Sequence, residues 1–240
     1  MNLSYIFGSL LFRGIRAVRQ SYMYIIMHLT MPLSILFIVG VISNGTLLPF
    51  ALAGGVVMSI ASGFNGTAYS AAIFRLDDKY QDMIVATKTG PVSYMFGSSL
   101  SNLIWMAPGI LLYLLLDAFY HLLTPSSLLV TIIIVVPLIL FVEALAFMLS
   151  SLVKHVRALG AYTTIIAFLL TVLPPTFYPY THLSGVELAG LSLIPVTPAA
   201  VLEQGIFGLE PMHWYMLAVL IVEAVVYFSI AVCLTRWRER

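Results

Sequence analysis

Residues 75–91, RLDDKYQDMIVATKTGP, form the longest polar run between two strongly apolar segments of the chain. In a helix, one stripe of this run would hold Leu76, Tyr80, Met83 and Thr87, at i, i+4, i+7 and i+11. The side turned away from that stripe would hold Asp78, Gln81 and Asp82. Such a helix is too short to cross a bilayer. It fits a water interface between two membrane spans, where it can dock onto a soluble partner, and an ordinary solvated loop fits the same residues equally well.

The composition indicates an integral membrane protein. Of the 240 residues, 61% are hydrophobic and only 9% are charged, and the mean hydropathy is +1.03, whereas a soluble domain carries roughly 25% charged residues. The net charge of +1 gives no argument for binding nucleic acid. The single cysteine, Cys233, excludes an internal disulfide and a site built on paired cysteines. Arginines follow the early apolar stretch 3–12 rather than precede it, so we expect no cleavable signal peptide.

Six apolar runs are long enough to span a bilayer core of about 30 Å, which needs roughly 20 residues per helix. They are residues 22–43, 49–74, 94–116, 128–150, 156–173 and 214–234. No internal repeat or low-complexity tract divides the chain. We therefore predict an all-α membrane protein with one domain, residues 1–240.

The basic residues predict the orientation of these spans. All eleven fall in four clusters: Arg13, Arg16 and Arg19; Arg75, Lys79 and Lys88; Lys154 and Arg157; and Arg236, Arg238 and Arg240. With both termini in the cytoplasm, every cluster lies inside, as expected for a multi-pass protein of the plasma membrane.

Residues 1–20 are expected to form an amphipathic helix. One face of the helical wheel holds Leu3, Phe7, Leu10, Leu11, Ile15 and Val18, and the opposite face holds Asn2, Ser9, Arg13, Arg16, Arg19 and Gln20. This pattern indicates a helix lying flat on the inner leaflet, with its arginines reaching lipid phosphates. A disordered basic tail is the alternative.

The long outer segment 174–213 is rich in proline, yet it also carries much Leu, Val, Ala and Phe. A fully solvated loop does not need so much apolar surface. We expect short re-entrant helices here, between the fifth and sixth spans, because irregular backbone at membrane depth must be covered by protein.

Intramembrane polar residues supply the candidate functional positions. In the second span Gly55, Ser59, Ser62, Gly63, Gly66 and Ser70 share a face, with Asn65, Thr67 and Tyr69 beside it. These residues fit close helix packing, and they fit a translocation path that includes Ser59, Ser62, Asn65 and Tyr69. Glu143 and Glu223 lie inside spans, where an ionised carboxylate is costly. They fit interhelical hydrogen bonds, and they fit a substrate or proton site.

Enzyme signatures are absent from the sequence. There is no HExxH, GxSxG or CxxC motif and no GxxxxGK[ST] phosphate loop, so we expect no catalytic, metal or cofactor site and no nucleotide site of the Walker type.

The layout resembles the permease subunit of ATP-binding-cassette (ABC) type-2 exporters. The resemblance is carried by Arg16, Arg19 and Met31-Pro32-Leu33 near the start, by 75–91 continuing into Val92-Ser93, and by PTFYP at 175–179 and IPVTPAA at 194–200. The sequence departs from the family where Lys79-Tyr80-Gln81-Asp82 replaces Glu-x-Gly-Thr and where Ile194 replaces asparagine.

The resemblance implies a dimer of six-span subunits, homo- or heteromeric, bound to two separate ABC ATPase subunits that hold ATP and Mg. ATP binding would push on Leu76, Asp78, Tyr80, Asp82, Met83 and Thr87, and would open a path lined by the second and fifth spans. Residues 150–157 would supply a second contact. The expected cargo is a small amphipathic or lipid-like molecule that is moved outward.

Two other functions remain open. A secondary transporter or channel would use Glu143 and Glu223 to bind protons or cations, although no inverted repeat supports it. A membrane-embedded enzyme acting on lipid would need a nucleophile and base, or a metal cluster, and the sequence supplies neither.

Overall fold

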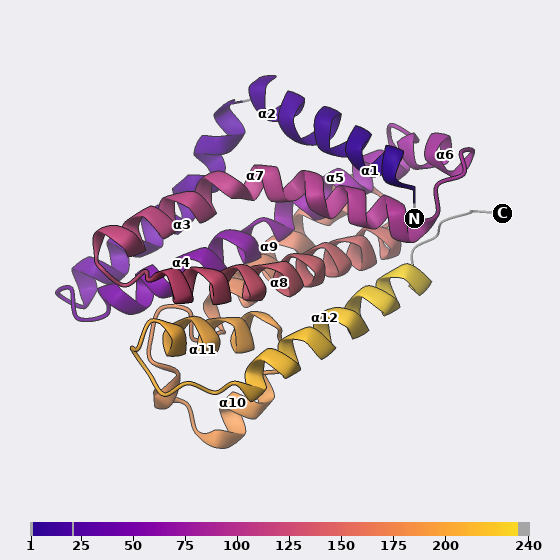
Figure 1. Cartoon of the computed structure of the whole chain (residues 1–240). Coiled ribbons are helices and arrows are strands. Elements are labelled where there is room, and N and C mark those ends of the chain that lie inside the picture. The colour runs from indigo at the N-terminus through magenta and orange to yellow at the C-terminus, as the bar shows by residue number, and fades with distance from the viewer. Residues whose placement is uncertain (1, 21, 235–240) are drawn as a thin grey trace.

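The computed structural model describes residues 2–20 and 22–234, and these residues form helices and no strand (Figure 1). The structure is 80% helical. Of the basic clusters, Arg236, Arg238 and Arg240 lie outside the described residues. The predicted all-α class is therefore confirmed for the described part of the chain.

Within the described residues, four helical segments are long and apolar enough to cross a membrane. Their bounds are Leu48–Leu76, which joins α4 (Leu48–Ser62) to α5 (Phe64–Leu76), α7 (Pro91–Phe119), α8 (Pro125–Leu152) and α12 (Tyr215–Leu234). They coincide with the expected spans 49–74, 94–116, 128–150 and 214–234, and each of the two middle helices extends past its expected ends. Several long apolar helices of this kind fit a multi-pass membrane protein.

The other two expected spans correspond to α3 (Tyr22–Ile42), which has 21 residues, and α9 (Val156–Val172), which has 17. Among the described residues, their apolar stretches Pro32–Ile42 and Leu159–Val172 are shorter than a span. In the long segment after α9, α10 (Gly185–Leu191) and α11 (Val196–Ile206) meet at 119°. If this bent pair counts as one span, the described residues hold five.

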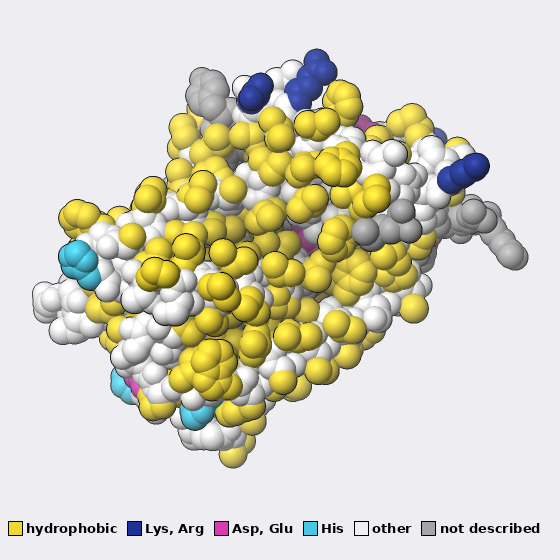
Figure 2. All heavy atoms as spheres, in the orientation of Figure 1, with side chains coloured by type: hydrophobic (Ala, Val, Ile, Leu, Met, Phe, Trp, Pro, Cys, Tyr) yellow, Lys and Arg dark blue, Asp and Glu magenta, His cyan; other side chains and the backbone are white. Residues whose placement is uncertain are grey.

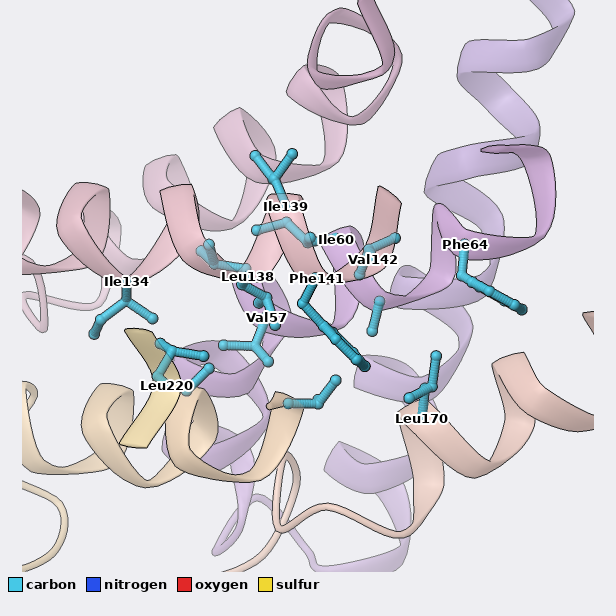
Figure 3. Packing of buried hydrophobic residues seen from close by; sticks show 14 of the residues in the cluster. Val57, Ile60, Phe64, Ile134, Leu138, Ile139, Phe141, Val142, Leu170 and Leu220 are labelled. Carbon is cyan, nitrogen blue, oxygen red and sulfur yellow. The ribbon is translucent and has the colours of Figure 1, made fainter. Parts of the chain in front are cut away.

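The core lies between α4 and α8. Figure 3 shows Val57 and Ile60 of α4 beside Leu138 and Phe141 of α8. Residues 51–61 of α4 are all buried, since α3, α7, α8, α9 and α11 pack around this helix. Small residues permit this close approach: a Cβ added at Gly55 would come within 1.9 Å of the Tyr113 ring of α7.

The two ends of the bundle differ in what caps them. At one end lie α6 (Tyr80–Val85) and α1 (Leu3–Ser9), and at the other lie α10 and α11 (Figure 1). We call them the α6 end and the α11 end.

The N-terminal segment lies along α7 and continues from α1 through a π-helix (η1, Leu10–Arg16) into α2 (Ala17–Gln20). Ile6 and Ser9 face the bundle, and the buried Ser9 hydroxyl lies 2.8 Å from the Ser101 hydroxyl. Other apolar side chains point outward, with Phe7 and Phe12 each 64% exposed. The segment is helical, and the alternative of a disordered tail is wrong.

The single helix considered for residues 75–91 does not form. Helix α5 ends at Leu76, and Lys79 adopts a left-handed backbone conformation with φ of 50° before α6 begins at Tyr80. A non-glycine residue with this φ interrupts a right-handed helix. As a result Gln81, expected on the outer side, is buried.

Candidate functional site

The exposed surface of the α5–α7 connection includes four of the six residues expected to couple to an ATPase. These are Asp78, Asp82, Met83 and Thr87, which we call the α6 face. Met83 is 59% exposed and directly follows the exposed Asp82. Asp82 and Met83 on α6, together with Asp78 just before it, form a surface that can meet a soluble partner.

The other two coupling residues lie beneath this face. Tyr80 is half-buried, and its ring centroid lies 5.4 Å from that of Phe74 on α5. Leu76 is half-buried at the end of α5. Tyr80 and Ile84 pack against a buried cluster that includes Tyr94 of α7 and Phe147 of α8. These contacts anchor α6 on three of the long helices.

Arg13 joins the N-terminal segment to this anchor. Its guanidinium lies 4.4 Å from the Phe74 ring centroid and 5.9 Å from that of Tyr80. Its Nη2 donates a hydrogen bond to the Ser98 hydroxyl of α7 at 3.3 Å. The backbone carbonyl of Arg13 accepts a bond from Trp105 Nε1 at 3.1 Å. Arg13, which is part of the N-terminal segment, thus contacts α5, α6 and α7.

The inward position of Arg13 corrects the sequence prediction, which placed it at lipid phosphates with Arg16 and Arg19. Arg16 and Arg19 are exposed as expected. The π-helical turn at Leu10–Arg16 accounts for the difference, because a π-helix has more residues per turn than the α-helical wheel assumes. Burial raises the pKa of the nearby Tyr5 hydroxyl, and the charge of Arg13 opposes that rise.

Asn2, near the N-terminus, also forms hydrogen bonds with residues that follow α6. The Asn2 side-chain amide donates to the Thr89 hydroxyl at 3.1 Å, and the Asn2 backbone N–H donates to the Ser93 hydroxyl at 3.0 Å. The N-terminal segment therefore holds the connection at both ends, through Arg13 before α6 and through Asn2 after it.

The predicted second inner contact lies at the same end of the bundle. Arg75, in the last turn of α5, donates to the backbone carbonyls of Ser151, at 3.4 Å, and of Val153. Lys154 and Arg157, in and just after the α8–α9 connection, are exposed. This connection is therefore fixed to the helix that leads into α6.

Glu143 lies at the meeting point of three helices and is fully buried. Its Oε1 accepts a hydrogen bond from Asn102 Nδ2 of α7 at 2.7 Å and another from the Thr67 hydroxyl of α5 at 3.3 Å. The geometry has the form of the interhelical hydrogen bond that the sequence left open. Asn102 was missed because nothing in the sequence marks it as a partner of a residue 41 positions away.

The residues expected to line a path do not gather around Glu143. Ser59 is buried at the α4–α7 contact, where a Cβ on Gly109 would lie 3.0 Å from its hydroxyl. Ser62 is half-buried, whereas Asn65 and Tyr69 are exposed on the outer side of α5. Glu223 is half-buried on α12, and its Oε2 has no hydrogen-bond partner among the described residues.

The α11 end holds polar residues that the sequence analysis missed. Glu203 of α11 is fully buried, and its Oε2 accepts a bond from the Thr131 hydroxyl of α8 at 3.0 Å. Asp117, one residue past the expected span 94–116, lies inside α7 and is also fully buried. A polar pair, Glu203-Gln204, inside an otherwise apolar stretch was the available signal.

Gln204 holds the loop that precedes α10. Its Oε1 accepts a bond from the Tyr180 N–H at 3.0 Å, and its Nε2 donates to the carbonyls of Pro175 and Tyr178 at 2.5 and 2.9 Å. One buried amide therefore satisfies three backbone groups of a segment that has few hydrogen bonds of its own.

No group of three His, Cys, Asp or Glu side chains that could hold a metal ion occurs within residues 2–20 and 22–234. Functional interpretation therefore depends on the α6 face, the Arg13 contacts and the buried carboxyl groups. No protein-family model matches the chain, and no curated protein matches it either.

Proposed function

We propose that this chain is the permease subunit of an ATP-driven exporter of the ABC type-2 class. It moves a small amphipathic or lipid-like molecule outward and takes its energy from a separate ATPase subunit. ATP and Mg bind to that partner, so the complex is an ATP-hydrolysing translocase while this chain has no ATPase site of its own. The observation that carries the proposal is the α6 face, an exposed acidic and apolar surface on a short helix held between long apolar helices.

The contacts beneath the α6 face supply a route for mechanical force. A push on Asp82 or Met83 reaches Tyr80, which packs on Phe74 of α5. Arg13 covers both rings and bonds to Ser98 of α7. Movement of α6 is thus passed to two long helices and to the N-terminal segment.

The membrane arrangement we propose has six spans, in which α3 and α9 join the four long helices and the α10–α11 pair enters the outer leaflet. Both termini and the α6 end face the cytoplasm, and the membrane is the plasma membrane. The distribution of charge supports this orientation. Figure 2 shows Lys and Arg only along the side of the visible face that carries α1, α2 and α6, with His side chains toward the opposite end. The outward apolar side of α1 would contact lipid.

A second permease subunit completes the proposed path. Ser62, Asn65 and Tyr69 form an exposed or half-exposed polar stripe on α4 and α5, beside α9. Polar side chains of a span face protein or a wet cavity rather than lipid. A second copy or a related chain placed against this stripe would enclose it, so that the second and fifth spans line the path.

The decisive experiment purifies the chain with its ATPase and reverses the charge of the α6 face. The variant Asp78→Lys, Asp82→Lys and Met83→Ala changes exposed residues only and leaves the half-buried Tyr80 anchor intact. Like charges placed across an interface cost several kcal/mol, so we expect at least about a tenfold loss of binding to the ATPase and loss of permease-stimulated ATP hydrolysis.

The matched control changes exposed residues at the α11 end, Val186→Ala and Glu187→Lys. It should bind the ATPase and stimulate hydrolysis as the unmodified chain does. Normal assembly and normal hydrolysis by the α6 variant would show that the docking assignment is wrong.

A secondary transporter or channel is the second candidate, and the half-buried, unpaired Oε2 of Glu223 favours it. Liposomes containing this chain alone discriminate the two functions. Gradient-driven flux that Glu223→Gln abolishes would support the second candidate. No flux without an ATPase would support the exporter.

A further inference from the structure

Arg13 and Glu143, a basic and an acidic residue, bond to the same face of α7. Nη2 of Arg13 donates to the Ser98 hydroxyl at 3.3 Å, and Asn102 Nδ2 donates to Oε1 of Glu143 at 2.7 Å. Ser98 and Asn102 lie one turn apart, at i and i+4, so they stand one above the other on the helix. The rise of an α-helix separates the two bonds by roughly 6 Å along its axis.

The contacts with α5 give the same alignment. Glu143 accepts a bond from the Thr67 hydroxyl at 3.3 Å, and the Arg13 guanidinium lies 4.4 Å from the Phe74 ring centroid. Thr67 and Phe74, at i and i+7, share a face of α5 and lie roughly 10 Å apart along it. Helix α5 ends at the α6 end of the bundle, so Phe74 is the nearer of the two to that end. Two helices therefore place the guanidinium roughly 6–10 Å from the carboxyl along the bundle, on its α6 side.

Each of the two side chains has a buried polar atom without a hydrogen-bond partner among the described residues. These atoms are Nη1 of Arg13 and Oε2 of Glu143, and the Tyr5 hydroxyl of α1 is another. Native proteins pair nearly all buried polar atoms. A guanidinium nitrogen can only donate, and an ionised carboxylate oxygen can only accept. One bridging group that both accepts and donates would satisfy the two side chains together.

The separation fits water as the bridging group. A direct hydrogen bond spans only about 3 Å, whereas one or two water molecules between the two atoms span roughly 6–9 Å. Buried waters in proteins typically join polar groups that have no other partner. The charge of Arg13 acts on Glu143, which agrees with this placement.

Within the part of the chain that the structure describes, the other ionisable side chains nearby do not supply the missing partner. Helix α4 carries none, and α8 carries only Glu143. Arg75 of α5 donates to the backbone carbonyls of Ser151 and Val153 at the end of α8. Tyr94 of α7 is a phenol, which is uncharged near neutral pH.

The remaining acidic groups and the histidines lie elsewhere. Glu203 bonds to Thr131, about 18 Å along α8 from Glu143. Glu223 belongs to α12, which packs on α8 and α11, whereas Glu143 bonds to residues of α5 and α7. The α11 end holds Asp117, His121, His182, Glu210 and His213, and at the α6 end the exposed groups include Asp77, Asp78, Asp82 and His155.

We propose that Arg13 and Glu143 form a buried ion pair that is joined through internal water and holds the N-terminal segment against α7 and α8. Arg13 supplies the counter-charge that an ionised carboxylate needs in the interior. The water returns part of the hydration that burial removes. Removal of the N-terminal segment from α7 would leave Glu143 without a counter-charge, so this segment moves with the bundle. The link lies within one chain and does not depend on an ATPase.

The first test is a double-mutant cycle on the full chain in detergent, with Arg13→Gln, Glu143→Gln and both changes together. Glu143→Gln keeps a carbonyl oxygen for Asn102 and Thr67 and removes the charge. Each single variant should lower the folding equilibrium constant by at least about tenfold, because the other charge is left unpaired. The double variant should lose about tenfold less than the product of the two single losses.

The matched control for the cycle combines Arg13→Gln with Glu203→Gln, whose carboxyl is equally buried but lies at the α11 end. In this control the two losses should multiply. Losses that also multiply for Arg13→Gln with Glu143→Gln would overturn the proposal.

Infrared spectra of the same variants report the charge of Glu143. At neutral pH, Arg13→Gln should gain the absorption of a protonated carboxylic acid, because the carboxylate loses its counter-charge and takes up a proton from water. The gain should be absent when Glu143→Gln is added and should persist when Glu203→Gln is added. If Glu143→Gln alone removed such an absorption, Glu143 would be protonated in the presence of Arg13, and the ion pair would be wrong.

An experimental density map that resolves ordered water tests the bridge itself. Water should lie within hydrogen-bonding distance of both Nη1 of Arg13 and Oε2 of Glu143, directly or through a second water. Direct contact of these two atoms, or apolar packing between them, would overturn the bridge.

Discussion

The two ends of the bundle are fastened in different ways. At the α11 end the contacts involve main chain: a Cβ on Gly54 would lie 1.8 Å from the Thr176 carbonyl oxygen, and Gln204 bonds three backbone groups. At the α6 end the side-chain stack of Arg13 on Phe74 and Tyr80 is prominent, and Arg75 also donates to the backbone carbonyls of Ser151 and Val153.

This difference indicates where movement can enter the molecule. Stacked aromatic and cation–π contacts contribute about 0.5–2 kcal/mol each and can re-form after a small displacement. Close main-chain packing cannot slide without a steric clash. A push applied at α6 would therefore shift the α6 end against a firm α11 end, as the proposed coupling requires.

The largest expected effect comes from adding one methyl group at each end. Gly54→Ala forces a Cβ into the Thr176 backbone and should cost about 3 kcal/mol of unfolding free energy. Gly97→Ala meets the Tyr5 ring at 2.9 Å and the Ile6 Cα at an ordinary 3.5 Å, and should cost less than about 1 kcal/mol because the Tyr5 side chain can turn aside. Chemical unfolding in detergent measures both, and equal costs would remove the contrast between the ends.

The next effect concerns the amide that fixes the loop before α10. Gln204→Glu keeps an acceptor for the Tyr180 N–H but removes the donors to Pro175 and Tyr178. Two buried carbonyls lose their partner, so stability should fall by about 2 kcal/mol. Gln20→Glu, at an exposed position, is the control and should change little. A Gln204 variant as stable as its control would contradict the role given to this amide.

A smaller and local effect is expected at the α6 end. Arg13→Lys keeps the charge but loses the planar group that covers Phe74 and Tyr80. The loss of about 1 kcal/mol should appear as faster amide hydrogen exchange in Tyr80–Val85, with little change in α11. Arg16→Lys, at an exposed residue, provides the comparison. Exchange that accelerates equally at both ends would mean that the ends are not independent.

The smallest effect is the pH response of α10. Hydrogen bonds from the Ser184 backbone and side chain hold the pKa of Glu187 below its ordinary value of 4.5. A lowered folded-state pKa stabilises the first turn of α10 above about pH 4.5, and this contribution is lost as the pH falls through the folded-state pKa. Amide exchange across Gly185–Leu191 should therefore rise in acid, and Glu187→Gln, which removes the titrating carboxyl, should remove that dependence. A response that also reached α11 would show that the two helices melt together.

Apolar run length predicted the long helices well, and their ends less well. The expected span 128–150 is part of α8, which starts earlier because Thr124 and Ser127 form a capping box around Pro125. Hydropathy does not measure capping. The break before α6 was not predictable either, since a lysine with positive φ has no mark in the sequence.

The site residues also divide into those that a local sequence pattern predicts and those that depend on three-dimensional packing. Exposure of Asp78, Asp82, Met83 and Thr87 agrees with the amphipathic pattern of a local segment. The burial of Asp117 and Glu203 depends on how the helices pack, and the inward turn of Arg13 needs a π-helix. Local periodicity determines neither of these.

The most direct test of the account is a cross-link between the α6 face and the ATPase. Cys233 is the only cysteine, and it is exposed, so Cys233→Ser followed by Met83→Cys places one reactive thiol on the α6 face. Val186→Cys, 84% exposed at the α11 end, is the matched control in the same background. The account predicts that the thiol at 83 cross-links to the ATPase subunit in membranes and the thiol at 186 does not. Labelling of the thiol at 83 by a membrane-impermeant reagent on intact cells, without any cross-link, would contradict it.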